Sequence, residues 1–278
     1  TVEAAQRAGV ALPAPAWLYP GGGWIEPGAW VRHALATPGV RFVGRTEVAA
    51  VDHQGDGWVL RDAGGEVVAR AGVVVLANAA MAARLLAPLG GPAWPLAHSR
   101  GQVTSFASDA PSPLRLPVAG DGYALPLPGG RLLCGATRGA GEPGCDTSPR
   151  ADDHRLNLQR LQRLTGLQPS PAADMQGRVG WRLHSDDRLP VAGAVPRAAL
   201  APGQRLDQAR WLPRQAGLFV LTALGARGLT LAPLMGRLVA AQATGTPWPL
   251  EQDLADAVDP GRWIVRAARA AAVRPQPG

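Results

Sequence analysis

The segment between positions 217 and 245 has the pattern of a ligand-binding turn. An apolar run ends at Leu224, the residues Gly225-Ala226-Arg227-Gly228 turn the chain, and a helix is predicted from about Leu231 to Thr244. Glycines let a ligand approach the backbone closely, and free N–H groups at a helix start favour an anion or an electron-rich oxygen. Pro233 is expected in the first helical turn, where no intrahelical donor is lost. An ordinary strand-to-helix turn explains the same pattern.

A second set of candidates lies on a strand predicted over Val179–Leu183. Alternate side chains of a strand share one face, and two arginines beside a glycine there would hold a carboxylate through paired hydrogen bonds. The competing interpretation is a surface strand whose arginines are solvated or paired with Asp186 and Asp187. The residues predicted to share the face are Arg178, Gly180, Arg182 and His184.

A third set is Ser99-Arg100-Gly101-Gln102-Val103, at the start of a predicted middle sheet. Gly101 permits close approach to the backbone, and the amide of Gln102 offers both a donor and an acceptor. His98 and His184 are possible bases, although a single histidine is more often an ordinary residue with a satisfied hydrogen bond.

Composition excludes several classes of enzyme. The chain has 278 residues, with 28 arginines, no lysine and a formal net charge of +7. Without lysine there is no pyridoxal-phosphate Schiff base, no lysine nucleophile and no phosphate-binding loop of the GxxxxGK type. The scarcity of Lys, Asn and Ile fits the codon bias of a GC-rich genome. The arginine excess therefore leaves binding to an anionic partner such as RNA open.

Cysteine and histidine patterns predict neither disulfides nor a metal site. The two cysteines, Cys134 and Cys145, form no CxxC motif, and the five histidines never cluster at ligand spacing. No basic-then-apolar leader and no apolar run of about 18 residues occurs, so no membrane partner is expected. These features are typical of a soluble protein of a reducing compartment, the cytoplasm.

The elements that must position the candidate residues follow two patterns. A helix is predicted over 29–36. It is followed by short β-type runs separated by glycine turns. The run 73–77, apolar at every position, predicts a strand buried on both faces of a parallel sheet, with a helix over 79–89 after it. The other early strands are expected at Val40–Val43, Val48–Asp52, Trp58–Asp62 and Glu66–Ala71.

The middle of the chain has the pattern of an antiparallel sheet. Strands are expected near 102–106, 122–127 and 131–136, and Thr147-Ser148-Pro149 is suited to cap a helix over 150–165. A further strand over 217–224 returns to the first pattern. The sequence thus predicts an α/β fold of mixed α+β character, with a first layer over 1–94, an antiparallel domain over 95–178, and a return with a C-terminal helix over 179–278.

Six segments in order resemble the glycine oxidase/D-amino-acid oxidase superfamily of FAD-dependent oxidoreductases. Within it they are most similar to the FAD-dependent domain of the MnmC family, bifunctional enzymes that modify the wobble uridine of tRNA. The segments are GGGWIEPGAW (21–30), VVVLANAA (73–80), RGQV (100–103), YALPLPGGRLLCGAT (123–137), WRLHSDDRLPVAG (181–193) and GARGLTLAPLMG (225–236).

The resemblance implies an FAD held noncovalently by an α/β domain, with its ring against an antiparallel substrate domain. It implies that Arg182 holds a substrate carboxylate and that Gln102, with Gly101, faces the flavin. The remaining cofactor contacts implied are Val48 at the adenine end, Ala77 and Asn78 near the pyrophosphate, and Gly225, Arg227, Gly228, Leu229 and Thr230 at the flavin ring.

The chain also departs from the family. A strand, a G-x-G-x-x-G turn and a helix open the family's FAD domain and bind the pyrophosphate. That βαβ unit is absent here, because the Gly21-Gly22-Gly23 run lacks the spacing and follows proline-rich sequence. The N-terminal methyltransferase domain of the MnmC family is also absent. We therefore expect this chain to be the C-terminal portion of a larger protein.

The implied reaction is FAD-dependent removal of the carboxymethyl group from 5-carboxymethylaminomethyl-uridine in tRNA. Two alternatives stay open. One is an oxidase of free amino acids such as glycine or sarcosine on the same fold. The other is a noncatalytic remnant that binds RNA or a partner through its arginines, four of which lie between Arg262 and Arg274 without an acidic residue.

Overall fold

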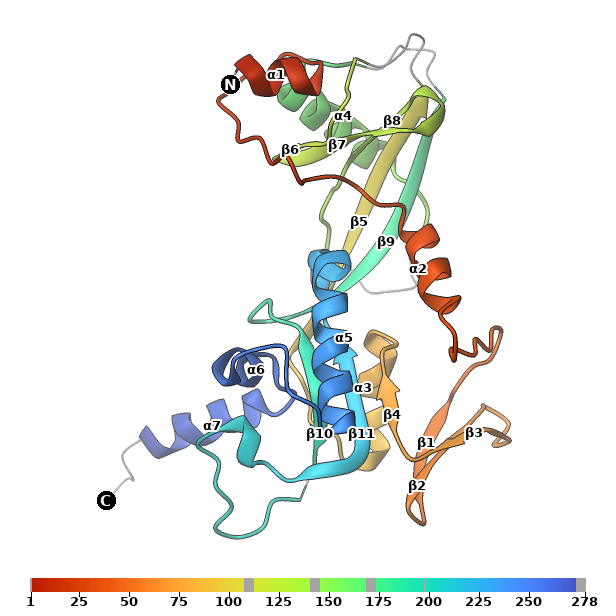
Figure 1. Ribbon diagram of the computed structural model, residues 1–278, viewed down its shortest axis with the longest axis vertical. Helices are drawn as coiled ribbons and strands as arrows, with labels where there is room; N and C mark the ends of the chain where they lie inside the picture. Colours follow the sequence, from red (N-terminus) through yellow and green to blue (C-terminus); the bar gives the residue numbers. More distant parts are fainter. Residues whose placement is uncertain (1, 108–112, 141–145, 169–173, 198, 274–278) are drawn as a thin grey trace. The chain divides into compact units, whose positions relative to one another are not determined.

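A computed structural model of the chain describes residues 2–107, 113–140, 146–168, 174–197 and 199–273 (Figure 1). Its helices are α1 (Val2–Ala8), α2 (Pro27–Leu35), α3 (Ala80–Leu86), α4 (Ala151–Thr165), α5 (Gly228–Thr244), α6 (Gln252–Val258) and α7 (Arg262–Val273). Its strands are β1 (Ala50–Gln54), β2 (Gly57–Arg61), β3 (Val67–Ala71), β4 (Val74–Leu76), β5 (Leu96–Ala107), β6 (Val118–Gly120), β7 (Gly122–Leu127), β8 (Arg131–Gly135), β9 (Met175–Ser185), β10 (Val191–Pro196) and β11 (Arg214–Thr222).

The chain divides into two compact units. Unit 1 comprises Thr1–Val40 and His98–Trp181, and unit 2 comprises Arg41–Ala97 and Arg182–Gly278. The chain passes between the units after Val40, within β5 and within β9. The sequence predicted domain boundaries at 94/95 and 178/179 and none near residue 40. The first forty residues, however, group with the middle of the chain, whereas the sequence assigned them to the first layer.

Unit 1 contains a sheet with the strand order β6-β7-β8-β5-β9. The pairs β7–β8 and β5–β8 are antiparallel, as the sequence predicts for this region, and helix α4 packs on β7 and β8. Ala8 and Val10 pack in one apolar cluster with Phe106, Leu132 and Leu161. This burial explains why the N-terminal segment belongs to unit 1.

Unit 2 contains a mixed sheet with the order β10-β11-β4, in which β4 runs parallel to β11 and β10 antiparallel. Helix α5 lies along β10 and β11 (Figure 1), where Phe219 packs against Met235 and Leu238. The expected burial of β4 on both faces is wrong. Val75, the register partner of Phe219, is 43% exposed, because no described element covers β4 on the face that α5 covers farther along the sheet.

A second sheet of unit 2, in the order β1-β2-β3, is antiparallel throughout. Trp58 on β2 is buried, and its indole N–H donates to the carbonyl of Ala216 at 2.9 Å. The next residue, Gly217, has φ +69°, and a Cβ there would lie 2.2 Å from the carbonyl oxygen of Gly72. Only glycine therefore allows β11 to pass this close to Gly72, just before β4.

The mixed α/β fold class and the sequence of elements are confirmed, but several local expectations are wrong. No strand forms over 40–43, where Phe42 is exposed and no described strand pairs with it. Helix α5 begins at Gly228, so Pro233 lies inside the helix and not in its first turn. Helix α4 begins at Ala151, and no side chain of Thr147 or Ser148 caps it.

Within the part of the chain that the structure describes, no helix is both long and apolar enough to cross a lipid bilayer.

Candidate functional site

The candidate site lies in unit 2, at the carboxyl ends of two neighbouring parallel strands. Leu76 at the end of β4 faces Val220 of β11, so the chain leaves both strands at the same edge. The hydroxyl of Thr222 donates to the carbonyl of Ala79 at 3.0 Å and joins the two exits. Ligands of open α/β sheets bind outside the carboxyl ends of the strands. Ala77 and Asn78 are exposed at this edge, as a ligand-binding role requires.

The turn after β11 presents backbone donors at the same edge. A 3-10 turn over Gly225–Arg227 leads directly into α5, and Gly225 has φ +58°. No side chain caps α5, so the first N–H groups of this 17-residue helix, from Gly228 onward, have no partner within the helix. The hydroxyl of Thr230 donates to the carbonyl of Arg227 at 3.0 Å, and Leu229 is exposed. The turn therefore offers donors and an apolar side chain to a ligand.

Strand β9 brings Arg182 to this turn. A β-bridge joins His184 to Leu224, and the Cβ of His184 lies 3.6 Å from where a Cβ of Gly225 would be. Arg182 is two residues away on the same face of the strand. It is half-buried, and the described residues provide no hydrogen bond or ion pair to its guanidinium. Arg178 is exposed and belongs to unit 1.

The alternative in which the strand's arginines pair with the neighbouring aspartates is wrong for the described residues. Asp187 accepts hydrogen bonds from Arg262 at 2.9 and 3.0 Å and from Arg266 at 2.7 Å. Asp186 accepts from the indole of Trp263 at 3.1 Å. Burial alone would raise the pKa of the Asp187 carboxyl, but hydrogen bonds from Arg262, Ser185 and others outweigh burial and lower it. Helix α7 thus occupies both carboxylates.

Gly101 and Gln102 lie on β5 in unit 1, and both are buried. The amide of Gln102 pairs with one residue at the start of α4. Its Oε1 accepts from the backbone N–H of Arg150 at 2.8 Å, and its Nε2 donates to the carbonyl of Arg150 at 3.0 Å. Gln102 thereby holds the backbone of Arg150, the residue before a helix start that no side chain caps. This use of the amide is structural; its predicted role facing a flavin stays a prediction.

An ion cluster beside Gln102 was not predicted from the sequence. The buried Arg100 is 2.5 Å from Asp153 and 3.5 Å from Asp146, and it donates to the carbonyl of Ser148 at 2.6 Å. These contacts fasten β5 to the loop before α4. The available sequence signal was Asp153 in the first turn of a predicted helix. Sequence spacing alone does not connect this residue to Arg100.

Other reactive side chains of the described residues give no competing centre. No group of His, Cys, Asp and Glu among them is arranged to hold a metal ion. Burial raises the pKa of the Cys134 thiol to about 12, so it is no thiolate nucleophile at neutral pH, and Cys145 lies outside the described residues. His98 and His184 are both half-buried, and Nδ1 of His184 lies 3.3 Å from the carbonyl of Ser185.

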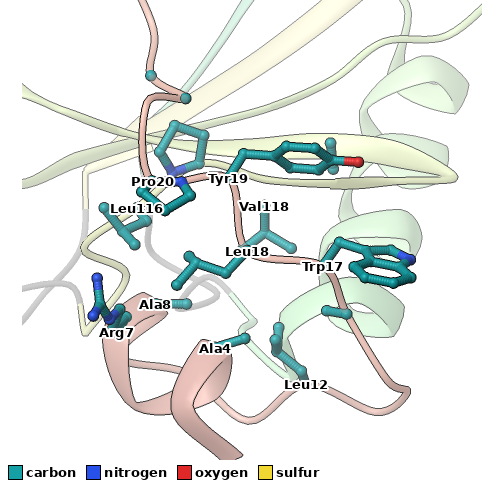
Figure 2. Close-up of a pocket in the computed structure, with 15 residues that line it drawn as sticks. Ala4, Arg7, Ala8, Leu12, Trp17, Leu18, Tyr19, Pro20, Leu116 and Val118 are labelled. Carbon is teal, nitrogen blue, oxygen red and sulfur yellow. The ribbon is translucent and has the colours of Figure 1, made fainter. Parts of the chain in front are cut away.

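A groove of about 380 Å³ in unit 1 lies between α1, the segment after it and the approach to β6. Figure 2 shows Leu18 directed toward Ala8, with the rings of Trp17 and Tyr19 on the other side of the segment. Arg7 is the charged side chain of the lining, and it is 2.9 Å from Glu3. The groove contains no acid, base or nucleophile suited to catalysis, so it is not the candidate site.

Comparison with known proteins places this geometry among flavoenzymes. Residues 2–242 match the family described as FAD dependent oxidoreductase. The tRNA 5-methylaminomethyl-2-thiouridine biosynthesis bifunctional protein MnmC of Methylibium petroleiphilum is 46% identical over 94% of this chain and 42% of its own length. The protein of the same name from Paraburkholderia phytofirmans is 40% identical over 98% of this chain and 42% of its own. The chain thus spans about two-fifths of the length of these curated relatives.

Solved structures agree. Glycine oxidase from Geobacillus kaustophilus superimposes with a TM-score of 0.58 and 26% identity, over 77% of this chain and 51% of that one. Iminodiacetate oxidase from Chelativorans sp. BNC1 gives a TM-score of 0.57 and 25% identity, over 74% of this chain and 51% of its own. Both are similar to this chain in fold.

Proposed function

We propose a function from the premise that the chain belongs to the family of FAD-dependent oxidoreductases, and is therefore part of an oxidoreductase that uses FAD. The proposed reaction is oxidative removal of the carboxymethyl group from 5-carboxymethylaminomethyl-(2-thio)uridine at the wobble position of tRNA. The products would be the aminomethyl-uridine and glyoxylate. Similarity to the MnmC proteins, whose name states tRNA 5-methylaminomethyl-2-thiouridine biosynthesis, supports tRNA as the substrate.

The observation that carries the proposal is the guanidinium of Arg182. The substrate side chain ends in a carboxylate, and a planar guanidinium binds a carboxylate through two parallel hydrogen bonds. Arg182 is half-buried, has no partner among the described residues, and stands two residues from His184, which bridges to the Gly225 turn through Leu224. A carboxylate held there would bring the neighbouring amine to the turn.

The residues of the turn fit the polar edge of a flavin. The Cβ-free positions Gly225 and Gly228 have no neighbouring atom closer than 3.6 Å to where a Cβ would be, so a flat ring has access to the backbone. The N–H groups of Gly228, Leu229 and Thr230, at the uncapped start of α5, would bind its oxygens, next to the backbone of Arg227. When bound, FAD supplies a hydride acceptor for the carbon beside the amine nitrogen. Donors at the ring edge would favour that transfer by stabilising negative charge.

The substrate amine needs no strong base from this chain, because a neutral amine carries its own lone pair. The task left to the protein is to hold the reacting carbon in position. His184 is half-buried and near the turn, yet the proposal assigns it no proton transfer.

We further propose that a strand from outside this chain completes the nucleotide end of the site. The outer edge of β4 pairs with no described strand, and Val73, just before β4, and Val75, within it, are both exposed. Parallel strands with both edges paired and both faces covered are the rule in such sheets. Ala77 and Asn78 would then lie near the pyrophosphate, and Val48, which packs against the cluster of Trp58, near the adenine end. We also propose that a methyltransferase domain belongs to the same protein. The word bifunctional in the name of the relatives supports a second activity beside the oxidoreductase.

The second candidate function is oxidation of free glycine or sarcosine, favoured by the similarity to glycine oxidase. The noncatalytic alternative has lost its main support, since Arg262 and Arg266 of the arginine-rich tail pair with Asp187. Purified full-length protein with a flavin absorbance band would contradict that alternative directly.

The test uses the full-length protein with FAD bound. Its flavin absorbance is followed after addition of tRNA carrying the carboxymethylaminomethyl group, and separately after addition of free glycine. Bleaching by the tRNA alone supports the proposed reaction, and bleaching by glycine alone supports the second candidate.

Arg182 is tested in the same assay. Arg182→Ala should raise KM for the tRNA about tenfold or more, the size expected for a lost charged hydrogen-bond pair, with FAD still bound. Arg182→Lys keeps the charge without the planar fork and should lie between. Unchanged kinetics in Arg182→Ala would remove this residue from the site.

A further inference from the structure

The turn that follows β9 carries an arginine without a partner. Arg188 is exposed, and its backbone N–H donates to the carbonyl of Ser185 at 3.2 Å. The described residues give its guanidinium no hydrogen bond, ion pair or ring contact. The adjacent Asp187 does not neutralise it, because that carboxylate is bound by Arg262 and Arg266. A full positive charge therefore stands at the end of the strand that carries Arg182.

The guanidinium of Arg227 is fixed against the backbone of Arg188. Nη2 of Arg227 donates to the backbone carbonyl of Arg188 at 2.5 Å, and no carboxylate of the described residues pairs with it. This contact ties the turn after β9 to the turn before α5. Arg188 and Arg227 thus lie on two joined turns of unit 2, and Arg182, also without an acidic partner among the described residues, lies on the strand that leads into the first turn. No acidic side chain of the described residues neutralises these charges, so this part of unit 2 presents positive charge to an approaching anion.

The backbone of Arg188 makes the choice of arginine more telling. Its φ of +61° is in the left-handed region, which glycine adopts at less cost than a residue with a Cβ. The side chain makes no described polar contact that compensates for this cost. The described residues give the side chain no partner within the protein, and a ligand for its charge would supply one.

We infer that Arg188 and Arg227 bind backbone phosphates of the RNA that carries the substrate side chain. This inference rests on the proposed function and extends it. A free amino acid such as glycine brings one carboxylate, for which Arg182 suffices. A polynucleotide brings further anions at regular spacing, and guanidinium groups bind phosphate oxygens in the same paired geometry. The two arginines would thus select RNA over free amino acids.

The experiment compares Arg188→Ala with Arg237→Ala in the full-length FAD-bound protein. Arg237 is an exposed arginine of α5 that has no described partner either, so it controls for loss of one surface charge. Each variant is assayed with modified tRNA and with the modified nucleoside alone, at several salt concentrations. In Arg188→Ala, KM for tRNA should rise about tenfold relative to KM for the nucleoside, as for one lost charged contact. The slope of log KM against log salt should fall by about 0.7 to 0.9.

Arg188→Gly separates binding from folding. Glycine relieves the left-handed backbone, so this variant should have a higher Tm than the wild type and yet the same loss of tRNA affinity. A structural role for the side chain would instead lower Tm and tRNA affinity together, and that result would overturn the inference.

Three other results bear on the inference. If Arg188→Ala behaves like Arg237→Ala while the wild type still oxidises tRNA, the inference is wrong and the proposed function stands. If Arg188→Ala lowers the affinity for FAD, the arginine serves the cofactor's phosphates and the inference is overturned. If the wild type oxidises glycine and not modified tRNA, the proposed function itself fails.

Discussion

The side-chain amide of Gln102 bonds to Arg150, the residue directly before helix α4. Both its oxygen and its nitrogen bond to the backbone of Arg150, and its side chain is fully buried. A residue chosen from sequence for its two-sided hydrogen bonding does use both sides, toward a helix end that lies 48 positions further along the chain. That distance in sequence is the reason why its partner was not foreseen.

Replacing Gln102 with Leu should lower the free energy of unfolding by about 1 to 3 kcal/mol, because the N–H of Arg150 would lose its acceptor and the carbonyl of Arg150 would keep only the N–H of His154. Urea denaturation of the variant and of Gln159→Leu, which changes an exposed glutamine of α4, measures the difference. Equal stability of the two variants would contradict this role of Gln102 in holding Arg150.

Asp187 makes the stability of unit 2 depend on pH. Its pKa is lowered in the folded protein, so its contribution is present above the unfolded value of about 3.9 and is lost as pH falls through and below that value. Between about pH 5 and pH 3 the wild type should therefore lose stability more steeply than Asp187→Asn, which has no proton to gain. Chemical denaturation at several pH values measures both slopes, and parallel slopes would disprove the assignment.

The same carboxylate faces an arginine that is only 3% exposed, Arg262. Removing one partner of a buried pair leaves the other charge uncompensated, which costs about 3 kcal/mol or more. Asp187→Ala should therefore lower the unfolding midpoint in urea far more than Asp207→Ala, whose partner Arg205 is exposed. A midpoint shift equal in the two variants would show that the pair contributes little.

At the scale of elements, helix α5 shows where local pattern misleads. The glycine-rich turn is typical of a helix start, but glycine is a poor helix former, so the helix was expected to begin about three residues after Gly228. Tertiary packing against β10 and β11 overrides that preference. Pro233 consequently lies in the helix, where it cannot donate a hydrogen bond to the carbonyl of Leu229.

Pro233→Ala should restore that hydrogen bond and raise the free energy of unfolding by about 1 to 3 kcal/mol. Thermal or urea denaturation measures the change, with Pro247→Ala, outside the helix, as the control. A variant less stable than the wild type would show that the proline's rigidity in the unfolded chain outweighs the lost hydrogen bond.

Strands flanked by turn residues were predicted most faithfully. Strand β7 occupies Gly122–Leu127 as expected, since Gly122 and Pro128-Gly129 limit it on either side. The apolar residues at 40–43 resemble a strand equally well, yet they remain exposed. A strand needs a partner as well as a suitable composition, and the partner is a property of the fold. The turn at 225–228 and the face of Arg182 were local features, and for that reason both were predictable.

At the scale of the whole molecule, the feature that sequence did not reveal is the bare side of β4. Val75 was expected to be buried because apolar runs usually are, and it is exposed because no described residue covers it. The grouping of residues 1–40 with unit 1 was likewise unforeseen, since it depends on contacts between Ala8, Val10 and strands more than ninety residues away.

Val75→Glu in the full-length protein should lower FAD occupancy and stability, because the proposed additional strand and its cover would bury this position. Val67→Glu, at an equally exposed valine of β3, should leave FAD occupancy unchanged. Flavin absorbance per protein and Tm measure both effects. The same occupancy in both variants would refute a partner on that side of β4.

The close approach at Gly217 restricts which codon changes the gene tolerates at this position. A methyl group at this position would collide with Gly72 and push apart the strands whose ends form the candidate site. Changing one nucleotide of any glycine codon to give alanine would therefore abolish activity from a location that touches neither substrate nor cofactor. Selections for inactive clones should recover such alleles among those at Arg182, and second-site suppressors should map to the chain around position 72.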